Sequence, residues 1–282
     1  MNKDISAAML GDHEAAKRLT EQGVLLMQGD CLELLKDIPD GSVDMVLCDL
    51  PFGVTQNSWD KKIDLPALWR EWNRVSKENA AIVLNCQEPF TSELILSNRE
   101  NFKYKWTWSK KQCSGFLNAK KQPLRNCEDI AVFYRKQCVY NPQMRKGKLQ
   151  LKNTGGQTSN YGKFTYQPHK SEIYYPTTLL EFPLPRYKGG HQTQKPVPLL
   201  EYLISTYTNP GMTVLDNCMG SGSTGVACIN TGRKFIGMEL DHGYFEMAKQ
   251  RIEEVQVQAR LSWNTRAPIM SAEEMEMMEG ME

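Results

Sequence analysis

The sequence lacks the features that mark membrane, secreted and metal-binding proteins. No apolar run among the 282 residues approaches the roughly 20 residues that cross a bilayer, and the N-terminus has no apolar signal-peptide core. Eight cysteines are present without a C-x-x-C pair, and the four histidines show no metal-ligand spacing. We therefore expect a cytoplasmic protein with reduced thiols, no metal and no membrane partner.

Charge is nearly balanced overall, at +1 at pH 7, but it is distributed unevenly along the chain. Residues 102–170 hold fifteen lysines and arginines and only two acids, Glu128 and Asp129, so this segment carries +13 and the remainder −12. Aromatic side chains are interleaved with these cations. Such a segment predicts a polyanion, in particular a nucleic acid, as the partner of one face. The plainer alternative is a solvated lysine-rich surface.

Short apolar runs alternate with segments of helical periodicity along most of the chain. Because helices separate most of these runs, we expect an α/β fold, a Rossmann-like doubly wound sheet of seven mostly parallel strands. The expected strands are residues 24–28, 43–48, 80–84, 104–108, 130–134, 213–215 and 234–238. The expected helices are residues 31–38, 65–75, 88–97, 196–209, 224–231 and 244–255, and residues 110–126 are expected to form a loop.

Composition divides the chain into five parts. Residues 1–22 form a polar lead-in, and residues 23–135 and 191–258 carry the strand and helix patterns. Between them, residues 136–190 lose apolar periodicity, so we expect an irregular insertion with little core, placed where a substrate-contacting segment would lie. The alternative for this segment is a disordered linker. Residues 259–282 are acidic and Met-rich and are expected to be a frayed tail.

One expected strand ends at residues that can do chemistry. The apolar run 45–48 has no polar alternation, as in a parallel strand covered on both faces, and Asp49-Leu50-Pro51-Phe52 follows it. In open α/β sheets, ligands bind at the carboxyl ends of the strands. A carboxylate, a backbone carbonyl fixed by proline and a flat ring there can hold an exocyclic amino group and stack on its base. An ordinary strand-to-loop turn is the alternative.

A glycine-rich turn follows the strand expected at residues 213–215. In the stretch 216–222, Asp-Asn-Cys-Met-Gly-Ser-Gly, the glycines let the backbone approach a ligand, and the next helix begins with free N–H groups. Glu239 ends the following strand, about twenty residues after the glycines, where an acid can accept hydrogen bonds from ribose hydroxyls. Turn and acid together predict a nucleoside-type cofactor. Without the turn, Glu239 is equally well a solvated acid at a strand end.

Both of these stretches resemble motifs of DNA amino-methyltransferases. Residues 49–52 resemble the D/N/S-P-P-Y/F/W motif of these enzymes, with Leu50 in place of the first proline. Residues 216–222 resemble the D-P-F-x-G-S-G-T loop that binds S-adenosylmethionine, with Asn217-Cys218 in place of Pro-Phe.

A third motif lies before the glycine-rich turn. Residues 191–196, His-Gln-Thr-Gln-Lys-Pro, resemble the H-P-T-Q-K-P motif of the same enzymes and depart from it only at Gln192. Taken alone, this stretch is equally well a loop that caps a helix. The order of the three motifs is that of the permuted β group of the family. The resemblance covers residues 23–255 and implies a circularly permuted sheet, with residues 23–135 as catalytic half, 136–190 as target-recognition insertion and 191–258 as cofactor half.

The resemblance implies a site-specific enzyme that transfers a methyl group from S-adenosylmethionine to the N6 amino group of adenine in double-stranded DNA. The base is flipped out of the duplex, and its nitrogen attacks directly in line. Because the lone pair of this nitrogen is delocalised into the ring, the enzyme must accept both of its N–H bonds. The carboxylate of Asp49 can accept one, and the backbone carbonyl of Leu50, held by Pro51, the other. Phe52 is expected to stack on the base.

The resemblance also implies roles in cofactor and DNA binding, and no metal. Asp30 is expected to reach the adenine amino group of the cofactor and Glu239 its ribose, while the turn holds the methionine moiety. The full set of expected cofactor-binding residues is Asp30, Asp49, Thr193, Lys195, Asp216, Met219, Gly220, Ser221, Gly222 and Glu239. The cations expected to contact DNA are Lys110, Lys111, Lys120, Lys121, Arg125, Arg145, Lys146 and Lys148.

Several alternatives stay open. Aspartate-led motifs favour adenine N6, but some cytosine-N4 enzymes also begin with Asp. The unusual Leu50, Asn217 and Cys218 leave room for a catalytically inactive DNA-binding protein on the same scaffold, and RNA is a fourth candidate substrate. A homodimer and a cognate restriction endonuclease are open as partners. The adenine interpretation depends on one geometric condition: Asp49 and Gly220 must open onto the same edge of the sheet.

Overall fold

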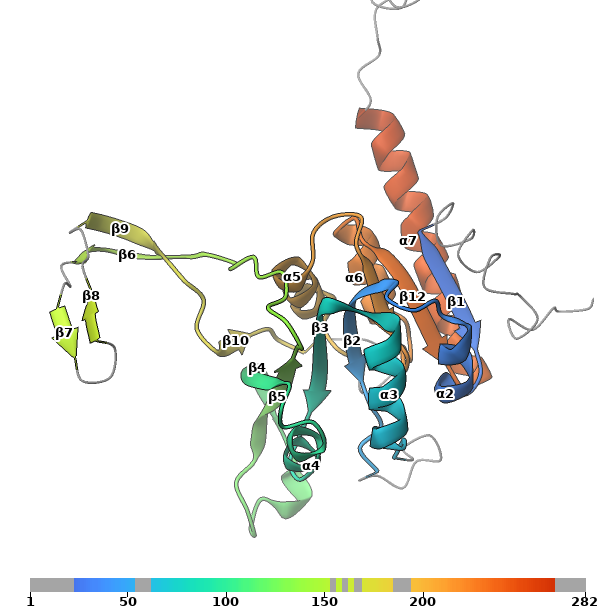
Figure 1. Ribbon diagram of the computed structural model, residues 1–282, viewed down its shortest axis with the longest axis horizontal. Coiled ribbons are helices and arrows are strands. Elements are labelled where there is room, and N and C mark those ends of the chain that lie inside the picture. Colours follow the sequence, from blue (N-terminus) through green and yellow to red (C-terminus); the bar gives the residue numbers. More distant parts are fainter. Residues whose placement is uncertain are drawn as a thin grey trace, which may run out of the picture.

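Eight strands form the central sheet of the computed structural model, which describes residues 23–53, 62–152, 156–158, 162–164, 169–184 and 194–266. The strand order is β1-β12-β11-β2-β3-β5-β4-β10 (Figure 1). The first five strands in this order are parallel, β5 is antiparallel to both β3 and β4, and β10 is parallel to β4. Their bounds are β1 Val24–Gln28, β2 Val43–Asp49, β3 Ser76–Cys86, β4 Phe102–Ser114, β5 Arg125–Phe133, β10 Leu179–Glu181, β11 Thr213–Asp216 and β12 Lys234–Glu239.

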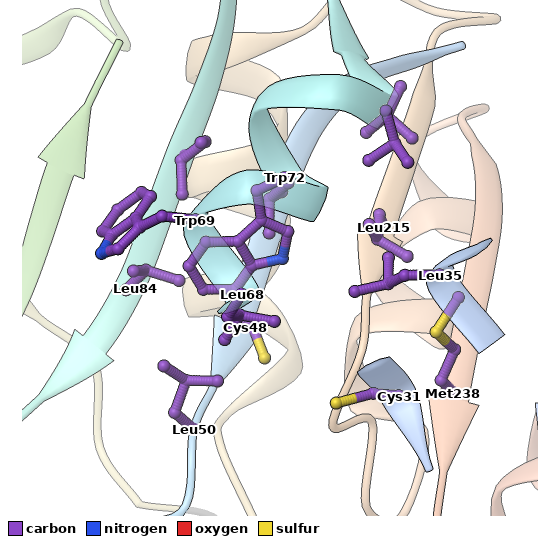
Figure 2. Packing of buried hydrophobic residues seen from close by; sticks show 14 of the residues in the cluster. Cys31, Leu35, Cys48, Leu50, Leu68, Trp69, Trp72, Leu84, Leu215 and Met238 are labelled. Carbon is purple, nitrogen blue, oxygen red and sulfur yellow. The ribbon is translucent and has the colours of Figure 1, made fainter. Parts of the chain in front are cut away.

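Helices cover both faces of the sheet. One face carries α2 (Cys31–Leu34) with the 3-10 turn η2 (Leu35–Asp37), α3 (Leu65–Val75) and α4 (Phe90–Ser97), and the other carries α5 (Val197–Tyr207), α6 (Ser223–Asn230) and α7 (His242–Arg266). Successive residues of β2 alternate between the two cores, with Val46 and Cys48 in the first and Met45 and Leu47 in the second. Figure 2 shows the first core, where Trp72 of α3 lies over the sheet. The strand is therefore covered on both faces, as its unbroken apolar run predicts.

Two aspartates determine where helices of the first layer begin. The Asp30 carboxylate accepts a hydrogen bond from the Leu32 amide at 2.8 Å, and the Asp64 carboxylate accepts one from the Ala67 amide at 3.2 Å. Such caps satisfy amide groups that have no partner inside the helix. They also anchor α2 and α3 next to the ends of β1 and β2, which matters for the site below.

All seven expected strands are confirmed, and the sheet contains an eighth, β10, within residues 136–190. Leu180 of β10 is 5 % exposed and packs in the second core, so this part of the expected insertion belongs to the sheet. A three-residue strand is too short to give a recognisable periodicity. The loop expected at 110–126 was too long, because β4 extends to Ser114 and β5 begins at Arg125. The closing helix continues to Arg266, past its expected end at residue 255.

The rest of the insertion forms thin antiparallel pieces outside the sheet. Strands β6 (Arg145–Lys152) and β9 (His169–Tyr174) pair as a ribbon that projects to the left in Figure 1, and β7 (Gly156–Thr158) pairs with β8 (Gly162–Phe164). Leu149 and Ile173 of the ribbon are 64 % and 53 % exposed, in line with an insertion that has little core. Within the described residues, no helix is long and apolar enough to cross a membrane.

Candidate active site

The carboxyl ends of the parallel strands bring four acids to one edge of the sheet. Strands β2 and β11 are neighbours in register, with Val214 opposite Met45, and they end at Asp49 and Asp216. On the other side of β11, β12 ends at Glu239, and β1 beside it is followed by Asp30. The geometric condition set by the sequence is therefore met, because the Asp49 strand and the strand before the glycine-rich turn end side by side.

Asp49 belongs to a cluster of four charged side chains. Lys195, just before α5, donates to the Asp49 carboxylate, and its Nζ lies 3.7 Å from Glu128 of β5. Glu128 also forms an ion pair with Lys110 of β4. The side chains of Lys195, Lys110 and Glu128 are 10 %, 10 % and 13 % exposed, whereas that of Asp49 is 32 % exposed. The least buried member of the cluster is thus the acid expected to meet the substrate.

The charges of this cluster stabilise one another. Burial lowers the pKa of Lys195, but the carboxylates of Asp49 and Glu128 outweigh burial, so the pKa is raised above its ordinary value. Burial raises the pKa of Glu128, but Lys195 and Lys110 outweigh it, so that pKa is lowered. Both directions favour the charged forms.

The backbone of β4 is irregular directly after Lys110. Lys111 has φ 57°, and the pairing of β4 with β5 is irregular between Ser109 and Ser114.

The residues after Asp49 divide between the core and the edge. Leu50 is 4 % exposed and packs in the first core, as Figure 2 shows, so the residue that replaces the family's proline is an apolar anchor. The Phe52 ring stacks on the ring of Phe90 at the start of α4, with centroids 5.2 Å apart and planes 29° from parallel. Phe90 is 3 % exposed, so it supports Phe52 from the core side.

The glycine-rich turn is held from inside by Asp216. This carboxylate is 3 % exposed and accepts hydrogen bonds from the Cys218 amide at 3.1 Å and from the Thr224 hydroxyl at 2.6 Å. Burial raises the pKa of Asp216 to about 6, although these bonds act in the opposite direction. These two hydrogen bonds fix the shape of the turn, and the expected role of Asp216 in cofactor binding stays a prediction.

Three further residues, Glu239, Arg251 and Gln194, support the turn and the start of α6. Glu239 accepts from the amides of Gly220 and Asp241, each at 2.9 Å, and burial raises the pKa of Glu239. Arg251 of α7 donates to the carbonyl oxygen of Ser221 at 3.1 Å. Gln194, oriented so that its side-chain oxygen accepts, takes hydrogen bonds from Arg251 and, at 2.9 Å, from the Ser223 hydroxyl.

The unusual Asn217 and Cys218 have structural partners. The Asn217 side-chain oxygen accepts from the Trp72 indole N–H at 3.0 Å, which links the turn to α3 across 145 positions of sequence. The Cys218 side chain packs against the first core, to which Cys31 and Cys48 belong. Burial raises the pKa of Cys48 to about 12, so this thiol stays protonated. The two replacements therefore fill the interior rather than destroy the turn.

The edge near Gly220 fits a nucleoside cofactor with a charged tail. Gly220 has φ 51°, and a Cβ placed on it would meet no described atom within 4 Å, so the backbone can lie directly against a ligand. Asp30 follows β1 and Glu239 ends β12, with Gln28 paired to Glu239, so the two acids lie at the ends of neighbouring strands. Met219, the other expected turn residue, is 5 % exposed and packs in the second core. Thr193 lies outside the described residues.

The cations expected to contact DNA do not form one set. Lys110 is 8 % exposed and belongs to the charge cluster, so a phosphate contact from it does not fit the structure. Lys111 pairs with Glu181, and Lys146 lies 3.5 Å from Glu172. Arg145 lies over the Tyr174 ring and donates to the Tyr175 carbonyl oxygen at 3.2 Å. The remaining expected cations are exposed, namely Lys120, Lys121, Arg125 and Lys148.

Glu128 is the site residue that sequence reasoning missed. It appeared only as one of two acids in a basic segment, yet it bridges two of the lysines beside Asp49. An acid retained within a strongly basic segment was the signal, because an acid surrounded by cations is stabilised by them.

Comparisons with known proteins agree with this geometry. A family model described as DNA methylase (N6/N4 methyltransferases) matches residues 43–250. DNA adenine methyltransferase YhdJ of Escherichia coli (strain K12) is 30% identical over 254 residues, covering 84% of this chain and 85% of that protein. Type II methyltransferase M1.MboII of Moraxella bovis is 24% identical over 261 residues, covering 82% and 96%.

Solved structures extend the likeness to the fold. The M1.HpyAVI complex with S-adenosylmethionine is 28% identical and has a TM-score of 0.56 over 81% of this chain and 99% of that chain. The PvuII cytosine-N4 DNA methyltransferase, at 15% identity and a TM-score of 0.58 over 84% and 94%, shares the fold. Since the family model covers well over half of its length, the chain belongs to the N6/N4 DNA methylase family.

Proposed function

We propose that this protein transfers a methyl group from S-adenosylmethionine to the N6 amino group of adenine in double-stranded DNA. The observation that carries the proposal is the shared edge, where Asp49-Leu50-Pro51-Phe52 ends one strand and the glycine-rich turn follows the strand next to it. Family membership supports the reaction class, and the 30% identical relative is named an adenine methyltransferase. The aspartate at the start of the motif favours adenine over cytosine.

The chain's own residues supply acceptors for the target amino group. Lys195 holds the Asp49 carboxylate in place, so one charged acceptor is fixed before the base arrives. The carbonyl oxygen of Leu50 is anchored by the buried Leu50 side chain and by Pro51, and we assign it the second N–H bond. Drawing both N–H bonds toward acceptors makes the nitrogen lone pair available for attack. Asp49 is also placed to take the proton that the methylated nitrogen releases.

Phe52 supplies the surface on which the flipped base stacks. Its ring is already supported by Phe90 at 5.2 Å, so an arriving base would add to an existing pair of rings. Extruding a base costs a few kcal/mol, and stacking against an aromatic ring offsets part of that cost.

The cofactor side of the proposal rests on the turn and on the two strand-end acids. S-adenosylmethionine supplies a methyl group on a sulfonium that needs no further activation. Asp30 and Glu239 would hold its adenosine, and the open backbone at Gly220 would lie against the remainder. Lys195 was expected near the cofactor carboxylate, but its contacts with Asp49 and Glu128 favour a role on the acceptor side.

The remaining assignments are proposals of the same kind. The insertion of residues 136–190, to which the paired strands β6 and β9 belong, is a candidate target-recognition segment. Lys148 and the exposed cations of the β4–β5 hairpin are candidate phosphate contacts. A cytoplasmic location would give access to DNA and cofactor together. A restriction endonuclease is a candidate partner, since several relatives are named type II methyltransferases. Cytosine N4 is the second candidate target, because the family model covers both kinds of enzyme.

The test compares Asp49→Ala with the wild type on DNA from a methylation-free host. Methyl transfer should fall by at least about a hundredfold, because one acceptor of the amino group is removed. Cofactor affinity, measured by calorimetry, should change little. The matched control is Asp40→Ala, which removes a carboxylate that is 77 % exposed. Mass spectrometry of the nucleosides should show N6-methyladenine, and single-molecule sequencing gives the site.

Three outcomes would contradict the proposal in different ways. N4-methylcytosine as the product would assign the second candidate target. Salt-dependent DNA binding without methyl incorporation by the wild type would indicate an inactive binding protein. An Asp49→Ala variant as active as the wild type would remove Asp49 from the reaction.

A further inference from the structure

The turn that joins β4 to β5 carries two large apolar side chains that are exposed to solvent. Phe116 is 67 % exposed and Leu117 is 102 % exposed. They lie on the 3-10 turn η3 (Phe116–Asn118), which Gly115 begins with φ 87°. Single exposed leucines are ordinary on protein surfaces, but a Phe-Leu pair at the end of a projecting hairpin is not.

The hairpin projects from the charge cluster at the active site. Strand β5 is antiparallel to both β3 and β4, so β4 runs in the same direction as β3 and its turn lies at the edge where Asp49 lies. Figure 1 shows the hairpin extending past the ends of β2 and β3. Arg125 is three residues from Glu128 along β5, or about 10 Å, and the apolar tip lies beyond it. That reach exceeds the major-groove depth of roughly 8.5 Å.

The surroundings of the tip are cationic. Residues 111–126 contain no acid, and Lys120, Lys121 and Arg125 are all exposed. Such a rim suits a polyanion with an apolar interior, which is the chemistry of a DNA duplex: phosphates outside and stacked bases inside. It suits an apolar protein surface less well, since three cations would have to be desolvated there.

We propose that Phe116 and Leu117 enter the DNA base stack at the position from which the target base is flipped, while Lys120, Lys121 and Arg125 contact the flanking phosphates. The inference rests on the proposed function, because it requires a duplex at the edge that holds Asp49. Apolar side chains inserted between base steps are a known way to hold a duplex open. The inserted pair replaces the stacking that the flipped base gives up, and so keeps the base in the pocket long enough to react.

The first experiment compares Phe116→Ala/Leu117→Ala with the wild type on two duplexes that contain the recognition sequence. On the fully paired duplex, kcat/KM should fall by about tenfold, the equivalent of one lost stacking contact. On a duplex whose target base is mispaired, the fall should be less than about threefold, because that base leaves the stack at low cost. The control is Leu96→Ala on α4, a leucine that is 71 % exposed and so comparable in exposure with Phe116; this variant should match the wild type on both duplexes.

A second experiment needs no turnover. Fluorescence anisotropy should show that the wild type binds a duplex with an abasic site at the target position more tightly than the intact duplex. The tip variant should lose this preference. Lys120→Ala/Lys121→Ala should instead keep the preference and flatten the dependence of affinity on salt.

The outcomes separate the inference from the function beneath it. A wild type that methylates no DNA refutes the proposed function. The preference for the abasic duplex then decides whether Phe116 and Leu117 enter the base stack. If the Phe116→Ala/Leu117→Ala variant keeps both the preference for the abasic duplex and full activity on paired DNA, the insertion of these two side chains is overturned. Conversion of a wild-type dimer to a monomer by the tip substitutions, measured by light scattering, would also overturn it and assign the tip to self-association.

Discussion

The edge of the sheet that holds Asp49 and the glycine-rich turn has two sides, and different interactions fix the shape of each. On the cofactor side, formed by the ends of β1, β12 and β11, Asp216 and Glu239 accept hydrogen bonds from backbone amides and a hydroxyl of the glycine-rich turn. On the acceptor side, formed by the ends of β2, β3, β5 and β4, the same task falls to ion pairs of Asp49, Glu128 and two lysines.

This difference follows from what each side has to do. A nucleoside cofactor is recognised by the shape of a backbone turn, which hydrogen bonds to amides fix well. An amino group that must be made nucleophilic needs an acceptor whose charge and position do not change when water leaves. Two carboxylates and two lysines cancel in charge, so the acceptor side fixes Asp49 without leaving a net buried charge. Substitutions on the two sides should therefore fail in different ways.

The largest effect is expected from Glu128→Gln. This change leaves Lys110 and Lys195 with only Asp49 as a counter-charge, so the free energy of unfolding should fall by roughly 3–5 kcal/mol at neutral pH. Because the pKa of Glu128 is lowered in the fold, its contribution is present above 4.5 and is lost as the pH falls through the lowered value. Urea unfolding of both proteins across this range measures the difference, which should shrink in acid.

Two controls show whether the loss arises from unpaired charge. Glu128→Gln/Lys110→Met removes one acid and one lysine together and should recover much of the lost stability. Glu78→Gln breaks the exposed Lys136–Glu78 pair and should change stability little. Equal destabilisation by the single and the double variant would mean that packing, and not charge, is what Glu128 contributes.

The sequence indicated more of the cofactor side than of the acceptor side, because the two sides are built from different kinds of contact. The glycine-rich turn and Glu239 belong to local patterns, so short stretches of sequence pointed to them. The charge cluster joins Lys195, Glu128 and Lys110 from three distant segments, and no local pattern encodes that meeting. Strand β10 escaped for another reason: three residues carry no periodicity, and only the neighbouring β4 makes them a strand.

The next effect also depends on pH, and on the cofactor side the dependence should have the opposite sign. The pKa of Asp216 is raised from 3.8 to about 6 by burial, so the folded state favours the protonated carboxyl. Its contribution is therefore greatest below 3.8 and is lost as the pH rises through about 6. Asp216→Asn does not titrate, so its stability relative to the wild type should increase by about 3 kcal/mol over that window. Urea unfolding from pH 4 to 8 measures it, with Asp40→Asn as the surface control.

Parallel curves for the two proteins across that range would show that Asp216 is already compensated by its neighbours. The comparison of the two sides would then weaken, because Asp216 would behave as a paired charge does. The stability differences of Asp216→Asn and Glu128→Gln from the wild type should change with pH in opposite directions. That result would sharpen the comparison of the two sides, since burial sets the direction of the pKa shift of Asp216 and the lysines set that of Glu128.

The smallest expected effect lies at the hydrogen bond that ties the two sides together. Trp72 of α3 is fully buried, and its indole donates to Asn217 in the turn, which is 2 % exposed. Asn217→Ala leaves this donor buried without its acceptor and should cost about 1–2 kcal/mol. Cofactor affinity, measured by calorimetry, should fall as well, because the same bond fixes the turn. Trp72→Phe removes the donor and some packing volume.

The double variant Trp72→Phe/Asn217→Ala separates these contributions. If the bond couples α3 to the turn, the double variant should be more stable than the sum of the single losses predicts, by about 1 kcal/mol. Strict additivity would show that Asn217 acts only on its own turn. A turn held solely by Asp216 and Glu239 would then be independent of the acceptor side, and each half of the edge could vary without the other.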